Sequence, residues 1–192
     1  MDALPLSRIT AAQAGDAQAA GELVEEHHAR IFAFLRRLCG QDADAEDLTQ
    51  RTFARVWTSI GSYAGHSSVS SWIHGIARHV YLDWRRTRRP GESPPDAWWE
   101  ACASPDPGPA DQAASADLSR VVYAAVDALP EELRTVIHLH HYQGLTLQET
   151  AEALEVSAST VKNRLRGALE ELQAALVHRP DRRTRLPTSR PS

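Results

Sequence analysis

Residues 146–172 constrain this chain more than any other segment, because they predict two short helices joined by a tight turn. Thr146 and Glu149 have the T-x-x-E spacing of a capping box, in which each residue satisfies a backbone N–H group of the first helical turn. The turn falls at 154–156, and Ser157 is a favourable N-cap for the second helix. This spacing predicts a helix-turn-helix.

The second helix of this hairpin has one apolar face and one polar face. The apolar residues recur at helical spacing, and they are Val161, Leu165, Ala168, Leu169 and Leu172. The opposite face carries Ser159, Lys162, Asn163 and Arg166. A helix that buries one side and presents donors and cations on the other suits the major groove of DNA. An ordinary amphipathic hairpin with a solvated outer face has the same apolar pattern and remains the alternative.

The composition fits a globular helical protein with no disulfide framework. A length of 192 residues allows one larger domain or two small ones, and 42% of the residues are hydrophobic. No apolar run is long enough for a transmembrane helix, and MDALPLSRIT lacks the pattern of a secretory signal, so we expect no membrane insertion. The two cysteines, Cys39 and Cys102, lack C-x-x-C spacing and fit a reducing cytoplasm, with no support for redox sensing.

The distribution of charge and proline divides the chain into parts. The net charge of −4 does not indicate a nucleic-acid binder, but residues 85–89 are strongly basic, so local fields would have to attract DNA. Segment 90–117 holds six acidic residues, no basic ones and six prolines, which predicts an extended linker. Within it, Trp98 and Trp99 would cover a surface of this protein or of a partner.

These features predict an all-α fold with two small helical domains joined by a Pro-rich acidic linker. The expected parts are an N-terminal extension (1–19), a helical domain (20–89), the linker (90–117), a helix-turn-helix domain (118–177) and a basic disordered tail (178–192).

Three or four helices are predicted for the N-terminal domain, and three of them are assigned to segments of the sequence. The first has a buried face and stops at Gly40. The residues of that face are Val24, His28, Ile31, Leu35 and Leu38. The second spans about 44–60 with its polar strip free for a partner. Its buried stripe is Leu48, Thr52, Phe53, Val56 and Ile60, and its polar strip is Asp47, Gln50, Arg51 and Ala54.

The third helix, starting at Ser68 or Ser70 and running to about Arg88, combines a core face with a second patterned face. The core face is Val69, Ile73, Ile76, Val80 and Trp84, and the second face is His74, Arg78, Tyr81, Arg85 and Arg88. Cations that follow phosphates and rings that stack on bases are typical of single-stranded nucleic-acid binding. A solvated face with a basic C-terminal turn, which also complements the helix dipole, is the competing interpretation.

Taken in order, the segments 42–57, 70–89 and 128–172 resemble the extracytoplasmic-function (ECF) group of bacterial sigma-70-type sigma factors. The resemblance covers roughly residues 20–176. It implies a protein that joins core RNA polymerase, through the clamp helices of the largest subunit and the flap, and directs it to promoter DNA.

The resemblance also implies roles for individual residues. Its core-binding motif matches Asp47, Leu48, Gln50, Phe53 and Trp57. Its −10 segment, which captures the melted non-template strand, matches His74, Arg78, His79, Arg85 and Arg86. Its −35 recognition helix, which reads duplex DNA, carries Ser159, Thr160, Lys162, Asn163 and Arg166. Members of the group are often restrained by an anti-sigma factor, and we expect such a partner here.

Some positions depart from the pattern of the group. Arg51 stands where Glu is common and either alters a polymerase contact or pairs with Asp47 at i, i+4. Glu155 replaces the usual Gly of the turn, and if its backbone is left-handed it costs about 1 kcal/mol. His79 and Ser159 replace a common Asn and a common Gly, which affects promoter sequence more than function class.

Other classes of function find less support in the residues. His138, His140 and His141 do not share one helical face, so we expect surface or interface histidines rather than a metal site, and likewise for His27 and His28. No cofactor is expected, and no nucleophile, P-loop or dinucleotide motif suggests an enzyme. A helix-turn-helix regulator that does not join polymerase remains the alternative function.

Overall fold

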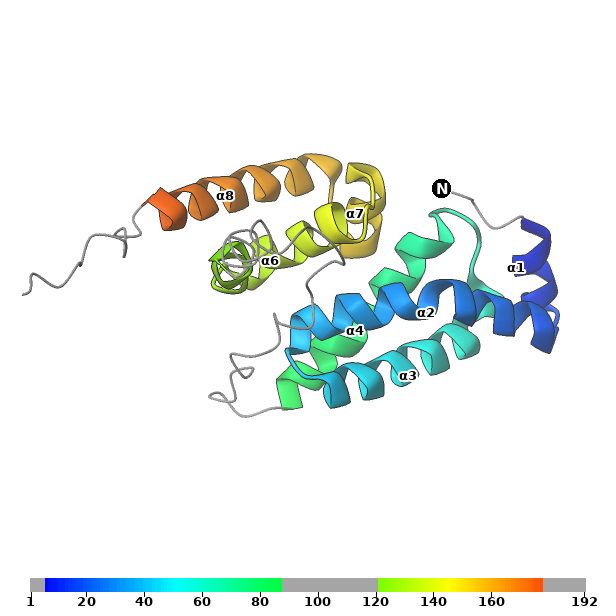
Figure 1. The fold of residues 1–192 in the computed structure, drawn as a ribbon. Coiled ribbons are helices and arrows are strands. Elements are labelled where there is room, and N and C mark those ends of the chain that lie inside the picture. The colour runs from blue at the N-terminus through cyan, green and yellow to red at the C-terminus, as the bar shows by residue number, and fades with distance from the viewer. Residues whose placement is uncertain (1–5, 88–120, 178–192) are drawn as a thin grey trace, which may run out of the picture.

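The computed structural model describes residues 6–87 and 121–177, and this part of the chain is all α-helical, as predicted. The N-terminal unit consists of α1 (Leu6–Gln13), α2 (Ala17–Cys39), α3 (Asp42–Ser59), the short 3₁₀ helix η1 (Ile60–Ser62) and α4 (Val69–Thr87). The C-terminal unit contains a helical segment at 121–127, α6 (Glu131–Ile137), the π-helical turn η3 (His138–Tyr142), α7 (Leu147–Leu154) and α8 (Ala158–Val177). Figure 1 shows the two units. The predicted linker 90–117 with Trp98–Trp99, and the tail 178–192, lie outside the described residues.

Helix α1 lies within the segment predicted to be an extension, yet it is part of the N-terminal unit. Ile9 and Ala12 are buried, and the Gln13 side-chain amide donates to the carbonyls of Ile60 at 3.0 Å and Tyr63 at 2.8 Å. These bonds tie α1 to the loop after α3.

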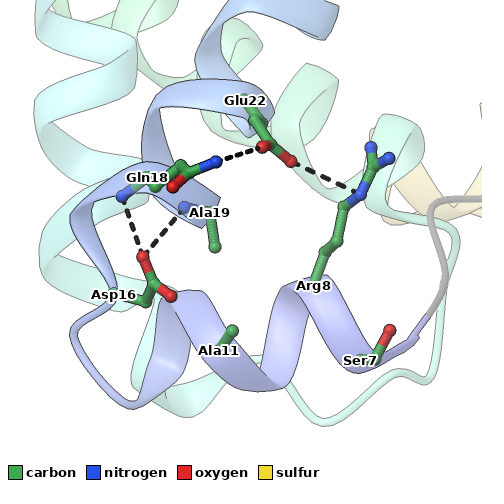
Figure 2. Close-up of a pocket in the computed structure, with 7 residues that line it drawn as sticks. All are labelled: Ser7, Arg8, Ala11, Asp16, Gln18, Ala19 and Glu22. Atoms are coloured by element: carbon green, nitrogen blue, oxygen red, sulfur yellow. Dashed lines mark hydrogen bonds and ion pairs between the residues drawn. The ribbon is translucent and has the colours of Figure 1, made fainter.

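The start of α2 is fixed by an N-cap that also lines a small pocket. The Asp16 carboxylate accepts from the backbone N–H groups of Gln18 and Ala19, at 2.9 and 3.2 Å. Figure 2 shows these bonds together with the ion pair between Arg8 and Glu22, whose atoms lie 3.5 Å apart. The polar groups around this cavity of about 280 Å³ are therefore largely engaged with one another, and we assign the pocket a structural role.

Helix α2 ends at Gly40, as predicted, with Gly40 in the left-handed conformation (φ 79°). Near the start of α2, the predicted buried face is shifted by one residue from the observed one. His28 is exposed and stacks on Phe53, with ring centroids 6.0 Å apart, whereas His27 is 5% exposed. The buried positions of α2 here are Leu23, His27 and Ile31, each one turn after the last.

Helices α3 and α4 match the predicted segments closely. The buried residues of α3 include Leu48, Thr52 and Val56, as predicted, while Phe53 is only half-buried. The Thr52 hydroxyl donates to the Leu48 carbonyl at 2.7 Å, so this polar residue is satisfied inside the core. Ser68 caps α4 by accepting from the N–H of Ser71 at 3.1 Å.

The helix-turn-helix is confirmed at the level of its caps. Thr146 and Glu149 form the reciprocal capping box, and Ser157 accepts from the N–H of Thr160 at 3.1 Å. Glu155 lies in the left-handed region at φ 55°, among the described residues the one non-glycine with positive φ. The condition left open in the sequence is therefore met, and a non-glycine residue occupies a left-handed position in this turn.

The two units pack against each other, with α7 on α4 and η3 on α2 (Figure 1). The backbones approach closely at Gly75 of α4, where an added Cβ would lie 3.4 Å from the backbone oxygen of Ala153 in α7. Arg30 of α2 donates to the carbonyl of Gln143 across this contact. Small residues at the crossing thus allow the helices to approach closely.

Candidate functional site

The predicted polymerase-binding residues lie on α3 as a partly exposed strip. Asp47 and Gln50 are exposed, and the Trp57 side chain is 48% exposed although it is large and apolar. Leu48 is fully buried and Phe53 half-buried, so these two position the helix rather than face solvent. An exposed tryptophan beside charged residues is a common feature of protein interfaces.

Arg51 pairs with Asp47 through atoms 2.8 Å apart, one helical turn away. The sequence left open whether Arg51 forms this pair or alters a partner contact, and the pair is present in the structure. Both side chains are about half exposed, so the pair is worth less than about 1 kcal/mol and leaves both groups accessible.

The predicted −10 residues lie on α4 at very different depths. His74 is completely buried, and its Nδ1 lies 2.7 Å from the Ser70 carbonyl oxygen. Burial lowers the pKa of His74 to about 4. A buried neutral imidazole cannot contact DNA in this arrangement.

Three more of the predicted −10 residues, Arg78, His79 and Arg85, lie at the edge of the contact with the C-terminal unit. His79 Nε2 lies 3.9 Å from a carboxylate oxygen of Glu155, and Arg85 pairs with Glu131. Burial lowers the pKa of Arg78, and nearby Glu155 partly opposes that shift.

Arg86 lies away from this contact, and its Nη1 is 3.5 Å from Asp83 of the same helix. Tyr81, predicted on the nucleic-acid face, is 3% exposed and packs beside Trp84, so that part of the predicted face is wrong. Tyr81 is buried because it packs against the rest of the helical bundle. Helical periodicity alone could not show which faces of α4 the other helices cover.

The predicted −35 residues lie along α8 and are accessible. Ser159, Lys162, Asn163 and Arg166 are exposed, Thr160 is half-buried, and Val161, Leu165 and Ala168 form the buried side. Leu169, predicted as part of the apolar stripe, is 55% exposed instead, because it has turned past the faces that meet α6 and α7. Arg164 of α8 forms an ion pair with Glu132 of α6, with the two atoms 2.6 Å apart. This pair helps to hold α8 against α6.

Two histidines predicted at the surface or an interface are core residues. His138 is 0% exposed, its ring lies tilted against that of Tyr142, and burial lowers its pKa to about 3. Burial also lowers the pKa of His27. Within residues 6–87 and 121–177, no cluster of His, Cys, Asp and Glu has the arrangement of a metal site.

Cys39 is buried, and burial raises the pKa of its thiol to about 11. Its thiolate is therefore scarce at neutral pH, which disfavours a role in redox sensing. Cys102 lies outside the described residues.

Sequence reasoning did not identify the residues that join the two units. Gly75, Arg30 and Gln143 were not singled out, because each looks ordinary on its own helix or loop. Gly75 in the middle of a helix is the one local signal, since such a glycine often marks close packing.

Comparison with known proteins places both units in one family. Residues 23–90 match the model of sigma-70 region 2, and residues 119–172 match that of sigma-70 region 4. Over 158 residues the chain is 34% identical to the ECF RNA polymerase sigma factor SigE of Mycolicibacterium smegmatis, covering 81% of this chain and 61% of SigE. It is 32% identical to the ECF RNA polymerase sigma factor SigX of Bacillus subtilis over 155 residues, covering 79% of this chain and 80% of SigX.

A solved structure supports the same fold. The sigma factor RpoE of Bartonella quintana, crystallised with the anti-sigma factor NepR, has a TM-score of 0.61 and 23% identity, covering 83% of this chain and 98% of that one. Among the described helices, none is long and apolar enough to cross a membrane. With matching models for both units and a relative covered over most of its length, the chain belongs to the ECF group of the sigma-70 family of RNA polymerase sigma factors.

Proposed function

We propose that this sigma factor divides promoter recognition between its two helical units while α3 holds it on core RNA polymerase. The observation that carries the proposal is the exposed polar face of α8, set on a capped helix-turn-helix within the region 4 match. On this proposal α8 enters the major groove of the −35 element, with Lys162 and Arg166 near phosphates or base edges and Asn163 on a base.

The second part of the proposal concerns α4. Arg78, Arg85 and Arg86 supply cations and His79 supplies an imidazole for the melted strand at −10, in the region 2 match. Extracting bases from the duplex costs a few kcal/mol, which contacts to the flipped bases must offset. His74 is completely buried in this arrangement, with its ring edge-on to Phe34 of α2, so it can join them only if the packing around it changes.

Polymerase binding is assigned to α3. Asp47 and Gln50 provide exposed polar groups, and Trp57 provides an exposed ring that would become buried against the clamp helices of the largest subunit. The flap of core polymerase would bind the C-terminal unit. Holding both units on one polymerase raises the effective concentration of each for its DNA element, so two weak sites read one promoter.

The chain on this proposal is not an enzyme, since RNA synthesis belongs to the polymerase, and it works in the cytoplasm where polymerase and nucleoid lie. An anti-sigma factor is proposed as its regulator, in line with the solved complex of a structurally similar sigma factor with one. The exposed strip on α3 would be one surface for that partner.

The deciding experiment is run-off transcription with core polymerase on a pool of promoter fragments, with wild-type chain, Asp47→Lys and Glu25→Lys. Glu25 is exposed on α2, so Glu25→Lys makes the same charge change outside the α3 strip. Arg51→Ala controls for loss of the Asp47–Arg51 pair. Transcripts that need the chain, disappear with Asp47→Lys and persist with both controls support the proposal. Duplex binding without any polymerase association would favour the regulator that does not join polymerase.

A further inference from the structure

A cavity of about 420 Å³ lies at the junction of the two units, between α2 and the end of η3. Its volume falls in the range of about 300–1,000 Å³ that is typical of pockets for small molecules. Small residues leave the space open. Ala29 and Ala33 lie one turn apart on α2, and an added Cβ at Gly144 would meet nothing within 4 Å. The walls are made by residues other than the predicted DNA-binding and polymerase-binding ones, so the cavity is separate from those sites.

The ionisable groups that line this cavity are basic, apart from the phenol of Tyr142. Arg30 and Arg37 lie two turns apart on α2, and His141 of η3 lines the same space. Within the part of the chain that the structure describes, no carboxylate lines the cavity. Glu149 of α7 feels the charge of Arg30 but lies outside these walls. A hollow with cations on its walls and no counter-charge attracts anions.

The two guanidinium groups are not neutralised by a carboxylate partner among the described residues. Arg30 donates to the carbonyl of Gln143, which uses one of its five N–H donors. Arg37 lies over the ring of Tyr142, with its guanidinium carbon 3.8 Å from the ring centroid. This contact engages the face of the cation. The Nη1 atom of Arg37 is buried and has no hydrogen-bond partner in the described part of the chain. A buried donor without an acceptor is unfavourable, so a small turn of this group toward a bound anion would be favourable.

Phosphate fits this arrangement better than a carboxylate does. The planar fork of an arginine binds pairs of phosphate or carboxylate oxygens. Here the basic groups line one space from two different elements, and a phosphate group presents its oxygens in several directions, whereas a carboxylate presents two oxygens in one plane. The cavity is also larger than one phosphate ion, so it has room for the rest of a phosphorylated molecule.

We infer that this cavity binds a phosphate-bearing small molecule, held by Arg30 and Arg37 of α2 and by His141 of η3. Inorganic polyphosphates and organic phosphates share this chemistry and are its two sources. Because the ligand contacts both units, it binds the arrangement in which α2 and η3 are packed together. The inference goes beyond the proposed function and is tested on the chain alone, so its failure would leave the sigma function untouched.

Isothermal titration calorimetry of the full chain with pyrophosphate, ADP, citrate and adenosine tests the inference. Pyrophosphate and ADP should bind with a Kd below about 1 mM, citrate more weakly and adenosine not detectably. Tighter binding of ADP would assign the site to organic phosphates, and equal or tighter binding of pyrophosphate would assign it to the phosphate groups alone. Absence of binding for both phosphate probes up to about 10 mM would overturn the inference, as would citrate binding as tightly as pyrophosphate.

A charge variant places the binding in this cavity. Arg30→Gln should weaken pyrophosphate binding by about tenfold or more, because it removes one charged fork from the site. Arg55→Gln is the matched control, since Arg55 lies on α3 outside the cavity and is about half exposed. It makes the same charge change and should bind as wild type does. Equal affinities in the two variants would place the binding elsewhere and overturn the inference.

A second variant fills the cavity without changing any charge. Ala33→Leu should also weaken pyrophosphate binding by about tenfold or more, because its side chain takes up the space of the ligand. It leaves Arg30 and its bond to Gln143 in place, so it remains informative if Arg30→Gln fails to fold. Ala174→Leu, at an exposed position of α8, is the control. Wild-type affinity in a folded Ala33→Leu protein, as judged by circular dichroism, would contradict the assignment.

The contribution of both units is tested by separating them. Gly75→Leu lies outside the cavity, and a side chain there meets the backbone of Ala153 in α7. If the ligand is held from both sides, pyrophosphate binding should weaken in this variant although every lining residue is intact. Undiminished binding in a variant whose units have separated would show that one unit suffices, and would overturn the site at the junction.

Discussion

At the scale of single residues, the chain places several side chains in environments that their type resists. Glu155 adopts a left-handed backbone, which side chains with a Cβ rarely do. His74 and His138 are fully buried and neutral. Each of these features carries a measurable cost to stability.

Replacing Glu155 with glycine should stabilise the protein by about 1 kcal/mol, because glycine adopts positive φ without steric strain. The exposed contact between Glu155 and His79 contributes little stability, so its loss offsets only a small part of this gain. Urea denaturation measures the change. Glu152→Gly, inside α7, is the control and should cost about 1 kcal/mol. A lower stability for Glu155→Gly would contradict the argument.

The buried histidines should make the free energy of unfolding fall as the pH drops below about 6.5. In the unfolded chain each imidazole takes up a proton near its ordinary pKa of 6.5, whereas in the folded chain the pKa is about 4 for His74 and about 3 for His138. Between these values the unfolded state binds more protons, so each group lowers stability by up to about 1.4 kcal/mol per pH unit.

Denaturation of wild type and His138→Leu at several pH values between 5 and 7 isolates this effect. The variant should lose the share of the pH slope that belongs to His138, whatever its stability at pH 7. Parallel slopes for the two proteins would show that His138 does not stay neutral in the fold.

At the scale of helices, each predicted interface is one face of one helix. Helix α3 buries Leu48 and Val56 and exposes Trp57, and α8 buries Val161 and Leu165 while exposing its polar side. The buried face sets the position of each helix, and the exposed face is left for a partner. Changes on the exposed face should therefore affect binding far more than stability.

Trp57→Ala should weaken binding to core polymerase at least tenfold, because a tryptophan buried at an interface commonly contributes 2 kcal/mol or more. Thermal stability should change little, since the ring is 48% exposed. Thr58→Ala, at the next exposed position of α3, is the control and should bind nearly as wild type does. Unchanged polymerase affinity in Trp57→Ala would remove this residue from the interface.

Asn163→Ala on α8 should reduce discrimination at one base pair of the −35 element by about 1–3 kcal/mol, as expected for loss of a side chain that reads a base edge. Lys162→Ala should instead weaken binding on all sequences and lower the salt dependence. Gln173→Ala, exposed farther along α8, controls for general effects. Competition binding on single-base variants of the site distinguishes these outcomes; a uniform loss for Asn163→Ala would assign it to the phosphates.

At the scale of the whole molecule, the packing of α7 on α4 decides which surfaces are accessible. Gly75→Leu should separate the units, because a side chain there meets the backbone of Ala153. The radius of gyration measured by small-angle X-ray scattering should increase. Gly21→Leu is the matched control, because nothing lies within 4 Å of a Cβ at Gly21. A radius that is equal in both variants would mean that the units are not held together at Gly75 in solution.

Much of this architecture could be predicted from local pattern. The capping box at Thr146 and the stop at Gly40 follow from the preferences of a few neighbouring residues, and both are confirmed. The bounds of α3 and α4 and the exposed side of α8 follow from helical periodicity. Proposed roles at polymerase and DNA came from the family resemblance and remain to be tested.

By itself the sequence determined the helices α2 to α4 and the helix-turn-helix, and which family the chain resembles, because caps and periodicity depend on residues within a few positions. It did not indicate α1. Only the tertiary structure decided that His27, His74, Tyr81 and His138 are buried and that Leu169 is exposed. It also placed Glu131 against Arg85 and Glu155 near His79. Those facts depend on which helices pack against each other, and that packing joins segments far apart in the chain. Helical periodicity shows that a helix has a buried face but does not show which other helix covers that face.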